Sequence, residues 1–307
     1  HERQANAQHD PALVHCSSKK TGASYCDSCT PSRELWYLSA IAPEAPKTME
    51  ISEHSRELAR DLLNFIDASP SPWHAVQTTA DRLLCAGFVA LREDERWQLV
   101  AGGRYFVIRG GASIVAFVMG RDNLDTCGFR LVGAHTDSPG LRIKPKALQG
   151  GDGLLRVGVE VYGGPILATF ADRDLSLAGR VAVRDGDGVA MRLVHFAEPL
   201  LRLPNLAIHM NREVNENGLK FNKQTELPLL LGLGGDGAAG DGRFHSLLAM
   251  QLAAAPDSVL NWELAVCDTQ PGSFWGAERE FVADGQLDNL ASCHAGLTAL
   301  LGAESSA

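Results

Sequence analysis

The chain has 307 residues, of which 45% are hydrophobic and 21% charged, and its formal net charge is −9. This length allows one large domain or two ordinary ones, and the composition is typical of a soluble globular protein. Acidic residues outnumber basic ones by 37 to 28, and no Lys/Arg cluster points to a nucleic-acid partner. No apolar run reaches the roughly 18 to 20 residues of a membrane span, so a membrane partner is not expected either.

Residues 1–48 are polar and aperiodic, and they predict a disordered extension. Within it, Cys26 and Cys29 have the spacing of a zinc knuckle, but no second pair follows and disorder is the favoured interpretation. No secretory signal pattern is recognisable at the start of the chain. The seven cysteines are scattered and odd in number, and a cytoplasmic, reducing location fits them best.

From Met49 onwards, apolar residues at a spacing of three and four predict helices, and alternating or β-branched runs predict strands. A hairpin turn is expected at Gly110–Gly111, and the apolar run 129–134 is expected to be a buried strand. The predicted helices are 49–68, 73–87, 246–255 and 289–301, and the predicted strands are 105–108, 114–119, 129–134, 154–162, 175–183, 189–196 and 259–266. The side chains predicted to face the core in the first two helices are Leu58, Leu62, Phe65, Ile66, Val76, Ala80, Leu83 and Leu84.

A histidine and an aspartate stand two residues apart just after the apolar run 129–134. At the end of an extended strand, His135 and Asp137 point to the same side, so the carboxylate can orient a metal-bound imidazole or bind the ion itself. Taken alone, the pair is also compatible with a polar loop that carries an ordinary surface histidine. Other residues have to decide between the two interpretations.

Asp288 stands at the entry to the last predicted helix. An aspartate at that place accepts backbone N–H bonds and offsets the helix dipole, so a helix cap is the simplest interpretation. Glu278 and Glu280 lie nearby in a polar connection, where carboxylates are normally solvated. We therefore do not expect either glutamate to act as a general base.

These two segments and three others resemble the aspartyl aminopeptidase family. The five motifs occur in family order, and the resemblance extends from about Met49 to the last residue. Its length and order make chance agreement implausible. The motifs are His135–Pro139, Asp172–Val181, Leu206–His209 with Val214–Asn217, Asp268–Pro271 and Leu287–Leu290.

The resemblance implies an α/β fold in which a mixed-sheet zinc-peptidase domain is interrupted by an inserted, mainly-β dimerisation domain. It divides the chain into the extension 1–48, a first peptidase part at 49–142, the insertion at 143–256 and a second peptidase part at 257–307. The implied activity is release of N-terminal Asp or Glu from peptides, through a water activated by two zinc ions. The implied assembly is a homo-oligomer, a dodecamer built from dimers.

The resemblance also implies roles for single residues. By the family's pattern, His135 binds one zinc ion, Asp288 bridges both ions, and Asp137 holds His135 in the correct tautomer. Asn289 helps to fix the geometry around the bridge. His209 lies in the inserted domain and reaches into the active site of a neighbouring subunit, where it helps to hold the substrate; the alternative for His209 is an inert loop histidine.

The sequence departs from the family after Asp288. The family's later motifs supply a Glu–Glu pair, another aspartate and a last histidine, and residues 289–307 do not match them. We therefore expect a C-terminally truncated sequence, an incomplete peptidase domain with exposed apolar surface, and a chain that is inactive as it stands. The alternative is a non-catalytic fragment that acts as an oligomerisation or interaction module.

Overall fold

The computed structural model describes residues 51–122, 128–234 and 241–303. The predicted disorder of residues 1–48 and the interpretation of Cys26 and Cys29 lie outside the described residues. All described residues belong to one unit of contacts, Ile51–Ala307. Within them, no helix combines the length and the apolar character that crossing a membrane would require.

Two helices at the start of the described chain begin at serine caps. Helix α1 spans Glu53–Asp67, and helix α2 spans Pro72–Cys85. The hydroxyl groups of Ser52 and Ser71 accept N–H bonds from the first turns, which otherwise lack acceptors. The prediction of both helices is confirmed.

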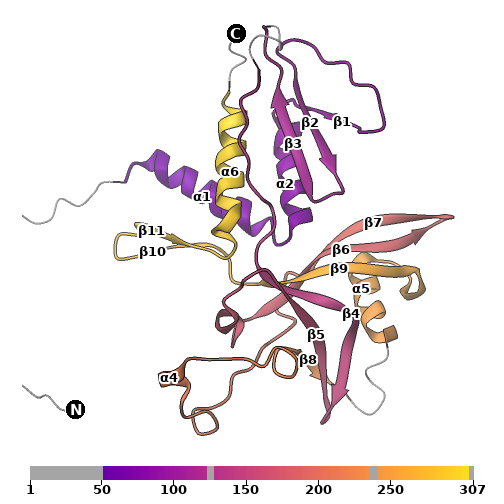
Figure 1. Cartoon of the computed structure of the whole chain (residues 1–307), viewed down its shortest axis with the longest axis vertical. Coiled ribbons are helices and arrows are strands. Elements are labelled where there is room, and N and C mark those ends of the chain that lie inside the picture. The colour runs from indigo at the N-terminus through magenta and orange to yellow at the C-terminus, as the bar shows by residue number, and fades with distance from the viewer. Residues whose placement is uncertain (1–50, 123–127, 235–240, 304–307) are drawn as a thin grey trace, which may run out of the picture. The chain divides into compact units, whose positions relative to one another are not determined.

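A three-stranded sheet packs with these helices (Figure 1). Strand β1 (Val89–Leu91) pairs in parallel with β2 (Arg104–Arg109), and β2 pairs antiparallel with β3 (Ser113–Val118) through the predicted turn at Gly110–Gly111. The C-terminal helix α6 (Leu287–Leu301) packs against α1 and α2. Their shared core consists of Phe65, Ile66, Ala75, Ala80, Leu83, Phe88, Phe106, Leu290 and Leu297.

A six-stranded sheet carries the larger core. Its strand order is β7-β6-β9-β4-β5-β8, and every pairing in it is antiparallel. Helix α5 (Asp241–Leu252) packs against it and buries Phe244 and Leu248. The strands are β4 (Gly140–Gly151), β5 (Leu154–Tyr162), β6 (Leu175–Asp185), β7 (Gly188–His195), β8 (Leu229–Leu233) and β9 (Val259–Asp268).

Shorter elements connect these groups. Strands β10 and β11 form an antiparallel hairpin that leads directly into α6. The short elements are the 3-10 helices η1 (Leu167–Phe170) and η2 (Pro256–Ser258), helix α4 (Val214–Asn217), and strands β10 (Ser273–Trp275) and β11 (Phe281–Ala283).

Arg180 of β6 joins the six-stranded sheet to the helical group. Its guanidinium donates to the main-chain oxygen of Gly110 at 2.8 Å and is paired with the carboxylate of Glu263 on β9. The same group lies 5.0 Å from the ring centroid of Trp73 on α2. This one side chain of β6 therefore contacts α2, the β2–β3 turn and the neighbouring strand β9 at once.

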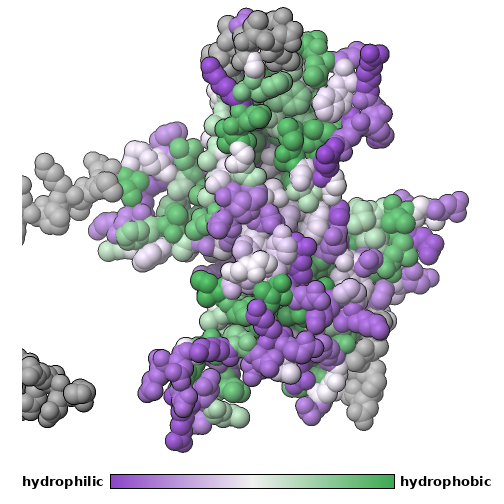
Figure 2. Space-filling model, in the orientation of Figure 1, coloured by the Kyte–Doolittle hydropathy of each residue, from purple (hydrophilic) through white to green (hydrophobic). Residues whose placement is uncertain are grey.

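Residues 129–134 do not form the buried strand that the sequence predicts. No strand among the described residues pairs with them, and Phe129, Leu131 and Val132 are 75%, 88% and 84% exposed. An apolar run becomes a buried strand only where other strands bond its N–H and C=O groups and other elements cover its faces. Figure 2 shows apolar side chains gathered over the region of α6 and β3.

Other differences from the predicted elements are smaller. Leu58 and Leu84 are exposed, whereas both were expected to face the core. Strands β4 and β8 were not predicted. Strand β9 lies between β6 and β4, so the six-stranded sheet contains residues from both sides of the predicted domain boundary at 256. The division into a peptidase domain and an inserted domain stays a prediction.

Candidate metal site

His135 and Asp137 follow the exposed segment and lie just before β4. The Nδ1 atom of His135 lies 2.9 Å from the main-chain oxygen of Asp137 and 3.4 Å from the carboxylate Oδ1 of the same residue. Because a carbonyl oxygen can only accept, Nδ1 carries the proton in the neutral ring and Nε2 keeps its lone pair. The ring therefore has the tautomer that binds a cation through Nε2. The sequence predicts this role for Asp137, and its main-chain carbonyl is the nearer acceptor.

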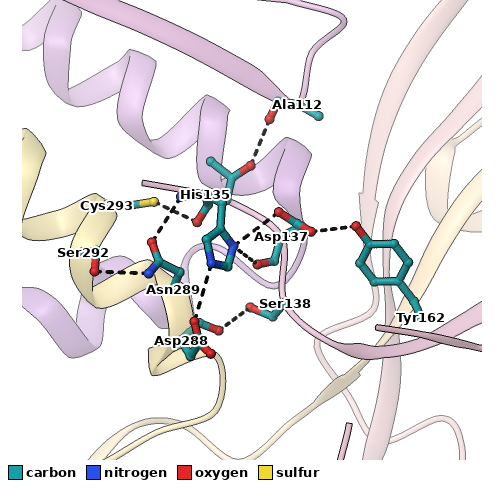
Figure 3. A network of polar contacts seen from close by, with 10 residues as sticks. Ala112, His135, Asp137, Ser138, Tyr162, Asp288, Asn289, Ser292 and Cys293 are labelled. Carbon is teal, nitrogen blue, oxygen red and sulfur yellow. Dashed lines mark hydrogen bonds and ion pairs between the residues drawn. The ribbon is translucent and has the colours of Figure 1, made fainter. Parts of the chain in front are cut away.

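Asp288 approaches the same imidazole ring from the start of α6 (Figure 3). Its carboxylate Oδ1 lies 3.6 Å from His135 Nε2, and its side chain is 84% exposed. The backbone is not helical at Asp288 and Asn289, and Gln286 occupies the cap position without a side-chain bond. The interpretation of Asp288 as a helix cap is therefore wrong, and its carboxylate points to the histidine instead.

Three hydrogen bonds join the two segments, and we call them the clasp. The side-chain oxygen of Asn289 accepts the His135 N–H at 3.1 Å, and the Cys293 thiol donates to the His135 carbonyl at 3.2 Å. The Ser138 hydroxyl donates to the main-chain oxygen of Asp288 at 3.0 Å. The clasp joins residues 150 to 158 positions apart and sets the His135 ring against the Asp288 carboxylate.

The last residue of β5 contacts the carboxylate behind the histidine. The Tyr162 hydroxyl donates to Asp137 Oδ2 at 2.6 Å. This bond is the main cause that lowers the pKa of Asp137 from its ordinary value, and the same bond raises the pKa of Tyr162. Asp137 is therefore ionised at neutral pH. The sequence predicted a strand ending at Tyr162, but it gave no register against the unpredicted β4 and so no contact with Asp137.

The donor atoms fit one side of a zinc ion. Zinc takes nitrogen and oxygen ligands at about 2.0–2.2 Å, usually in a tetrahedron. His135 Nε2 and Asp288 Oδ1, 3.6 Å apart, match two neighbouring corners of that tetrahedron in kind and roughly in separation. Within residues 51–122, 128–234 and 241–303, no group of three His, Cys, Asp or Glu side chains is placed to hold a metal. Catalytic zinc normally has three protein ligands, so these two residues would supply only part of a zinc site.

Glu278 and Glu280 lie in the turn between β10 and β11. There the Glu280 carboxylate accepts the N–H of Glu278 at 2.9 Å. An exposed carboxylate that is bonded within its own turn has an ordinary structural role. The expectation that neither residue is a general base stays a prediction.

Asp137 and Asp288 line one cavity of about 920 Å³. Pockets of about this size accommodate drug-sized ligands. Deeper in the wall stands Asp284, whose Oδ2 atom is buried without a hydrogen-bond partner in the described structure. Burial, together with the neighbouring carboxylate of Asp67, raises the pKa of Asp284 to about 7. Asp137 and Asp288 thus stand at an opening large enough for part of a peptide.

His209 is exposed in a turn just before α4. It does not belong to the residues that line the cavity beside Asp137 and Asp288. The structure therefore brings together three of the four predicted site residues: His135, Asp137 and Asp288. The predicted role of His209 concerns a neighbouring subunit, and it stays a prediction.

Residues 65–307 match the family described as Aminopeptidase I zinc metalloprotease (M18). The chain belongs to the M18 family. The match confirms the resemblance that the five motifs carry. It also includes every residue of the candidate metal site of this M18 chain.

Curated relatives of the M18 chain are named as probable M18 family aminopeptidase 2. The relative from Ectopseudomonas mendocina is 48% identical over 249 residues, which cover 80% of this chain and 57% of the relative. The relative from Pseudomonas aeruginosa strain UCBPP-PA14 is 48% identical over 252 residues, which cover 81% of this chain and 58% of the relative. The chain thus spans less than two thirds of the length of these relatives.

Solved structures show the same fold over part of their length. A chain in the cryo-EM structure of the Ape4 and Nbr1 complex is 39% identical with a TM-score of 0.76, and the match covers 80% of this chain and 50% of that one. Chaetomium thermophilum mApe1 is 32% identical with a TM-score of 0.74, and the match covers 81% of this chain and 59% of that one. The S. cerevisiae mApe1 dodecamer is 22% identical with a TM-score of 0.66, and the match covers 81% of this chain and 56% of that one. This match shows likeness of fold alone. The mixed α/β fold is thereby confirmed.

Proposed function

We propose that the protein is an M18 aminopeptidase that releases N-terminal Asp or Glu from peptides, with two zinc ions in each complete active site. The observation that carries the proposal is the approach of His135 Nε2 to the Asp288 carboxylate, across the clasp, in a chain of the M18 family. Bound zinc would polarise the scissile carbonyl and lower the pKa of the attacking water.

The described residues have distinct tasks in this proposal. His135 offers Nε2 to one ion because Asp137 accepts its Nδ1–H. Asp288 has two carboxylate oxygens and a largely exposed side chain, which suits a bridge between two ions. Asn289 fixes the backbone of His135 through the clasp. Among the described residues no third ligand stands beside His135 and Asp288, and in this proposal the general base and the further ligands come from the additional length that the curated relatives have.

We propose that the stretch 143–256 is a dimerisation domain inserted between peptidase parts at 49–142 and 257–307. A structure of related fold is a dodecamer. The exposed position of His209 supports a role outside its own subunit. In this proposal the assembly brings His209 to the substrate in a neighbouring active site.

The test uses a fusion protein that adds to this chain the part of a relative that the chain does not match. Residues 51–307 are fused to the part of the Pseudomonas aeruginosa relative that the chain does not match, and release of Asp and Glu from chromogenic amides is assayed. We expect zinc-dependent turnover. His135→Ala or Asp288→Ala should lower kcat/KM by roughly 1,000-fold, which corresponds to about 4 kcal/mol of transition-state stabilisation.

The control is His54→Ala, which removes an exposed histidine of α1. It should leave kcat/KM unchanged. Turnover that survives both site substitutions would overturn the metal assignment, and faster release of neutral residues would overturn the acidic preference. The 307-residue polypeptide alone should show no turnover and less than one bound zinc per chain, because two ligands hold the ion weakly.

A non-catalytic oligomerisation module is the second candidate function. The observation in its favour is that the six-stranded sheet and α5 have a buried core of their own, which includes no residue of the metal site. In that case the 307-residue polypeptide enters assemblies of a full-length M18 relative when the two are co-expressed. Multi-angle light scattering detects such mixed assemblies, and their absence would remove this candidate.

A further inference from the structure

Two side chains of the six-stranded sheet stand behind the Asp137 carboxylate. Arg142 is the third residue of β4, and Tyr162 is the last residue of β5. In the β4–β5 ladder, Gly140 is opposite Tyr162 and Arg142 is opposite Glu160. Arg142 and Tyr162 are therefore diagonal neighbours on one face of the sheet, a separation that long side chains span.

The two side chains are stacked. The guanidinium carbon of Arg142 lies 3.8 Å from the centroid of the Tyr162 ring, well within the distance of a cation–π contact. Within the described structure Arg142 forms no ion pair with a carboxylate, so the stack is its principal interaction with a side chain. Because the guanidinium of Arg142 lies over the ring, the Tyr162 hydroxyl stays directed at Asp137 Oδ2, 2.6 Å away.

We propose that Tyr162, braced by Arg142, is a positioning residue for the metal ligand His135. This inference rests on the proposed function, because it takes His135 as a zinc ligand. The hydroxyl of Tyr162 occupies Oδ2 of Asp137 and leaves Oδ1 directed at the Nδ1–H of His135, 3.4 Å away. Without that hydroxyl, the carboxylate rotates more freely and the imidazole ring loses one of its two restraints.

The main-chain carbonyl of Asp137 cannot replace this restraint. It accepts the Nδ1–H of His135 and so favours that tautomer, but a single acceptor leaves the ring free to tilt about that bond, and a ring that tilts away from it can carry the proton on Nε2 instead. The Asp137 carboxylate, held by the Tyr162 hydroxyl, reduces this tilt and keeps Nε2 directed towards Asp288. Partners of this kind, one step removed from the metal, typically change metal affinity by about 10- to 100-fold when they are lost.

The test uses Tyr162→Phe in the full 307-residue chain, since this change removes only the hydroxyl and keeps the ring for Arg142. Histidine is labelled with ¹⁵N, the His135 signals are assigned with His135→Gln, and the tautomer is determined without metal and then during zinc titration. We expect a single Nδ1–H tautomer in the unaltered chain and a mixture in Tyr162→Phe. The zinc concentration at half-saturation of His135 should rise about 10-fold.

Two further variants separate positioning from a general loss of structure. Tyr105→Phe removes a hydroxyl that accepts the Val100 N–H in the three-stranded sheet, and it should change neither the tautomer nor the zinc midpoint. Arg142→Lys keeps the positive charge but loses the flat guanidinium, so it should change both readouts in the same direction as Tyr162→Phe and by less.

The outcomes distinguish this proposal from the proposed function. An unchanged tautomer and an unchanged zinc midpoint in Tyr162→Phe overturn the positioning role, and they leave the metal assignment standing as long as zinc shifts the His135 signals. If zinc leaves the His135 signals of the unaltered chain unmoved, the metal assignment fails. In that case the comparison of tautomers still decides whether Tyr162 orients the ring.

Discussion

Two oxygen atoms of Asp137 lie near the Nδ1–H of His135, the main-chain oxygen at 2.9 Å and the carboxylate Oδ1 at 3.4 Å, and they have different effects. The main-chain oxygen of Asp137 is the nearer and favours the Nδ1–H tautomer, while the carboxylate brings the negative charge that stabilises an imidazole bound to a cation. The first contribution depends on the path of the backbone, and the second on the side chain. A substitution at position 137 therefore removes the charge and leaves only the backbone carbonyl to favour the tautomer.

Asp284 has an ionisation equilibrium that is linked to folding. Its Oδ2 atom is buried without a hydrogen-bond partner in the described structure, and burial together with Asp67 raises its pKa from 3.8 to about 7. Between these pH values the folded chain keeps a proton that the unfolded chain releases. The protonated Asp284 side chain therefore contributes to stability fully below pH 3.8. This contribution is lost as the pH rises through 7, because the folded chain then has to hold a buried charge.

We predict that Asp284→Asn stabilises the protein at alkaline pH. At pH 8.5 the free energy of unfolding should rise by about 2 kcal/mol, a value below the full linkage energy because solvent reaches part of the side chain. The gain should shrink as the pH falls towards 4. Urea denaturation over this pH range measures it, with the exposed Asp257→Asn as control. An equal gain at every pH would show that the charge of Asp284 is not the cause.

The sequence predicts the site residues that are recognisable by residue type within a motif. It does not predict the residues that contact the site only because of how the chain folds. His135, Asp137 and Asp288 stand in recognisable motifs, and the structure brings them together. Tyr162 depends on the register of β4 against β5, and the role of Cys293 depends on a helix passing a loop 158 positions earlier in the chain. Neither relation leaves a local pattern in the sequence.

Strands β6 and β9 lie close together at Gly179, which is opposite Leu264. A Cβ atom at that position would lie 2.1 Å from the main-chain oxygen of Glu263 and 3.0 Å from the Cα atom of Leu264. These are backbone atoms of a central strand, and they cannot turn aside as a flexible side chain can. Gly179 therefore permits the pairing that places Arg180 at the junction with α2.

We predict that Gly179→Ala destabilises the sheet by about 3 kcal/mol, since a methyl group there forces two paired backbones apart. Gly232→Ala is the matched control, because Gly232 also lies in a strand of the same sheet and a Cβ there would meet no atom within 4 Å. The control should change the free energy of unfolding by about 0.5 kcal/mol or less. Urea midpoints compare the two variants, and equal midpoints would contradict the prediction.

The sequence predicts most helices and strands because their periodicity is undisturbed. Helices α1, α2 and α6 and strands β5, β6, β7 and β9 occur where apolar spacing places them. Strand β4 was missed because Lys144, Pro145 and Lys146 interrupt its alternation at the point where the register against β5 shifts. Strand β8 was missed because a short, continuous apolar run does not distinguish a strand from a helix.

The segment 129–134 leaves an apolar surface of the protein uncovered. Phe129, Leu131 and Val132 are each at least 75% exposed, although a Cβ at Gly296 on α6 would come within 3.7 Å of Val132. The apolar pattern predicts burial, but burial also requires atoms from elsewhere that pack on the segment. This is why the prediction of a buried strand is wrong for the described residues.

We predict that the 307-residue chain associates with itself through this segment, because exposed apolar runs of this kind bind other apolar surfaces. The double substitution Leu131→Ser with Val132→Thr should lower the average mass in light scattering and the fluorescence of a bound apolar dye. Met250→Ser is the control, because Met250 is a single exposed apolar residue of α5 at 74% exposure. Equal association of the unaltered chain, the double variant and Met250→Ser would show that another surface causes the association.

The clasp also bears on how the segment between Ser138 and Asp288 can vary in length. The polypeptide leaves the clasp at Ser138 and returns to it at Asp288, where the Ser138 hydroxyl lies 3.0 Å from the Asp288 carbonyl. The segment between these two residues therefore begins and ends at neighbouring positions in space. A segment whose ends lie close together can hold an inserted folding unit. A segment held at both ends in this way can be longer, shorter or of another fold while the histidine and the aspartate keep their places.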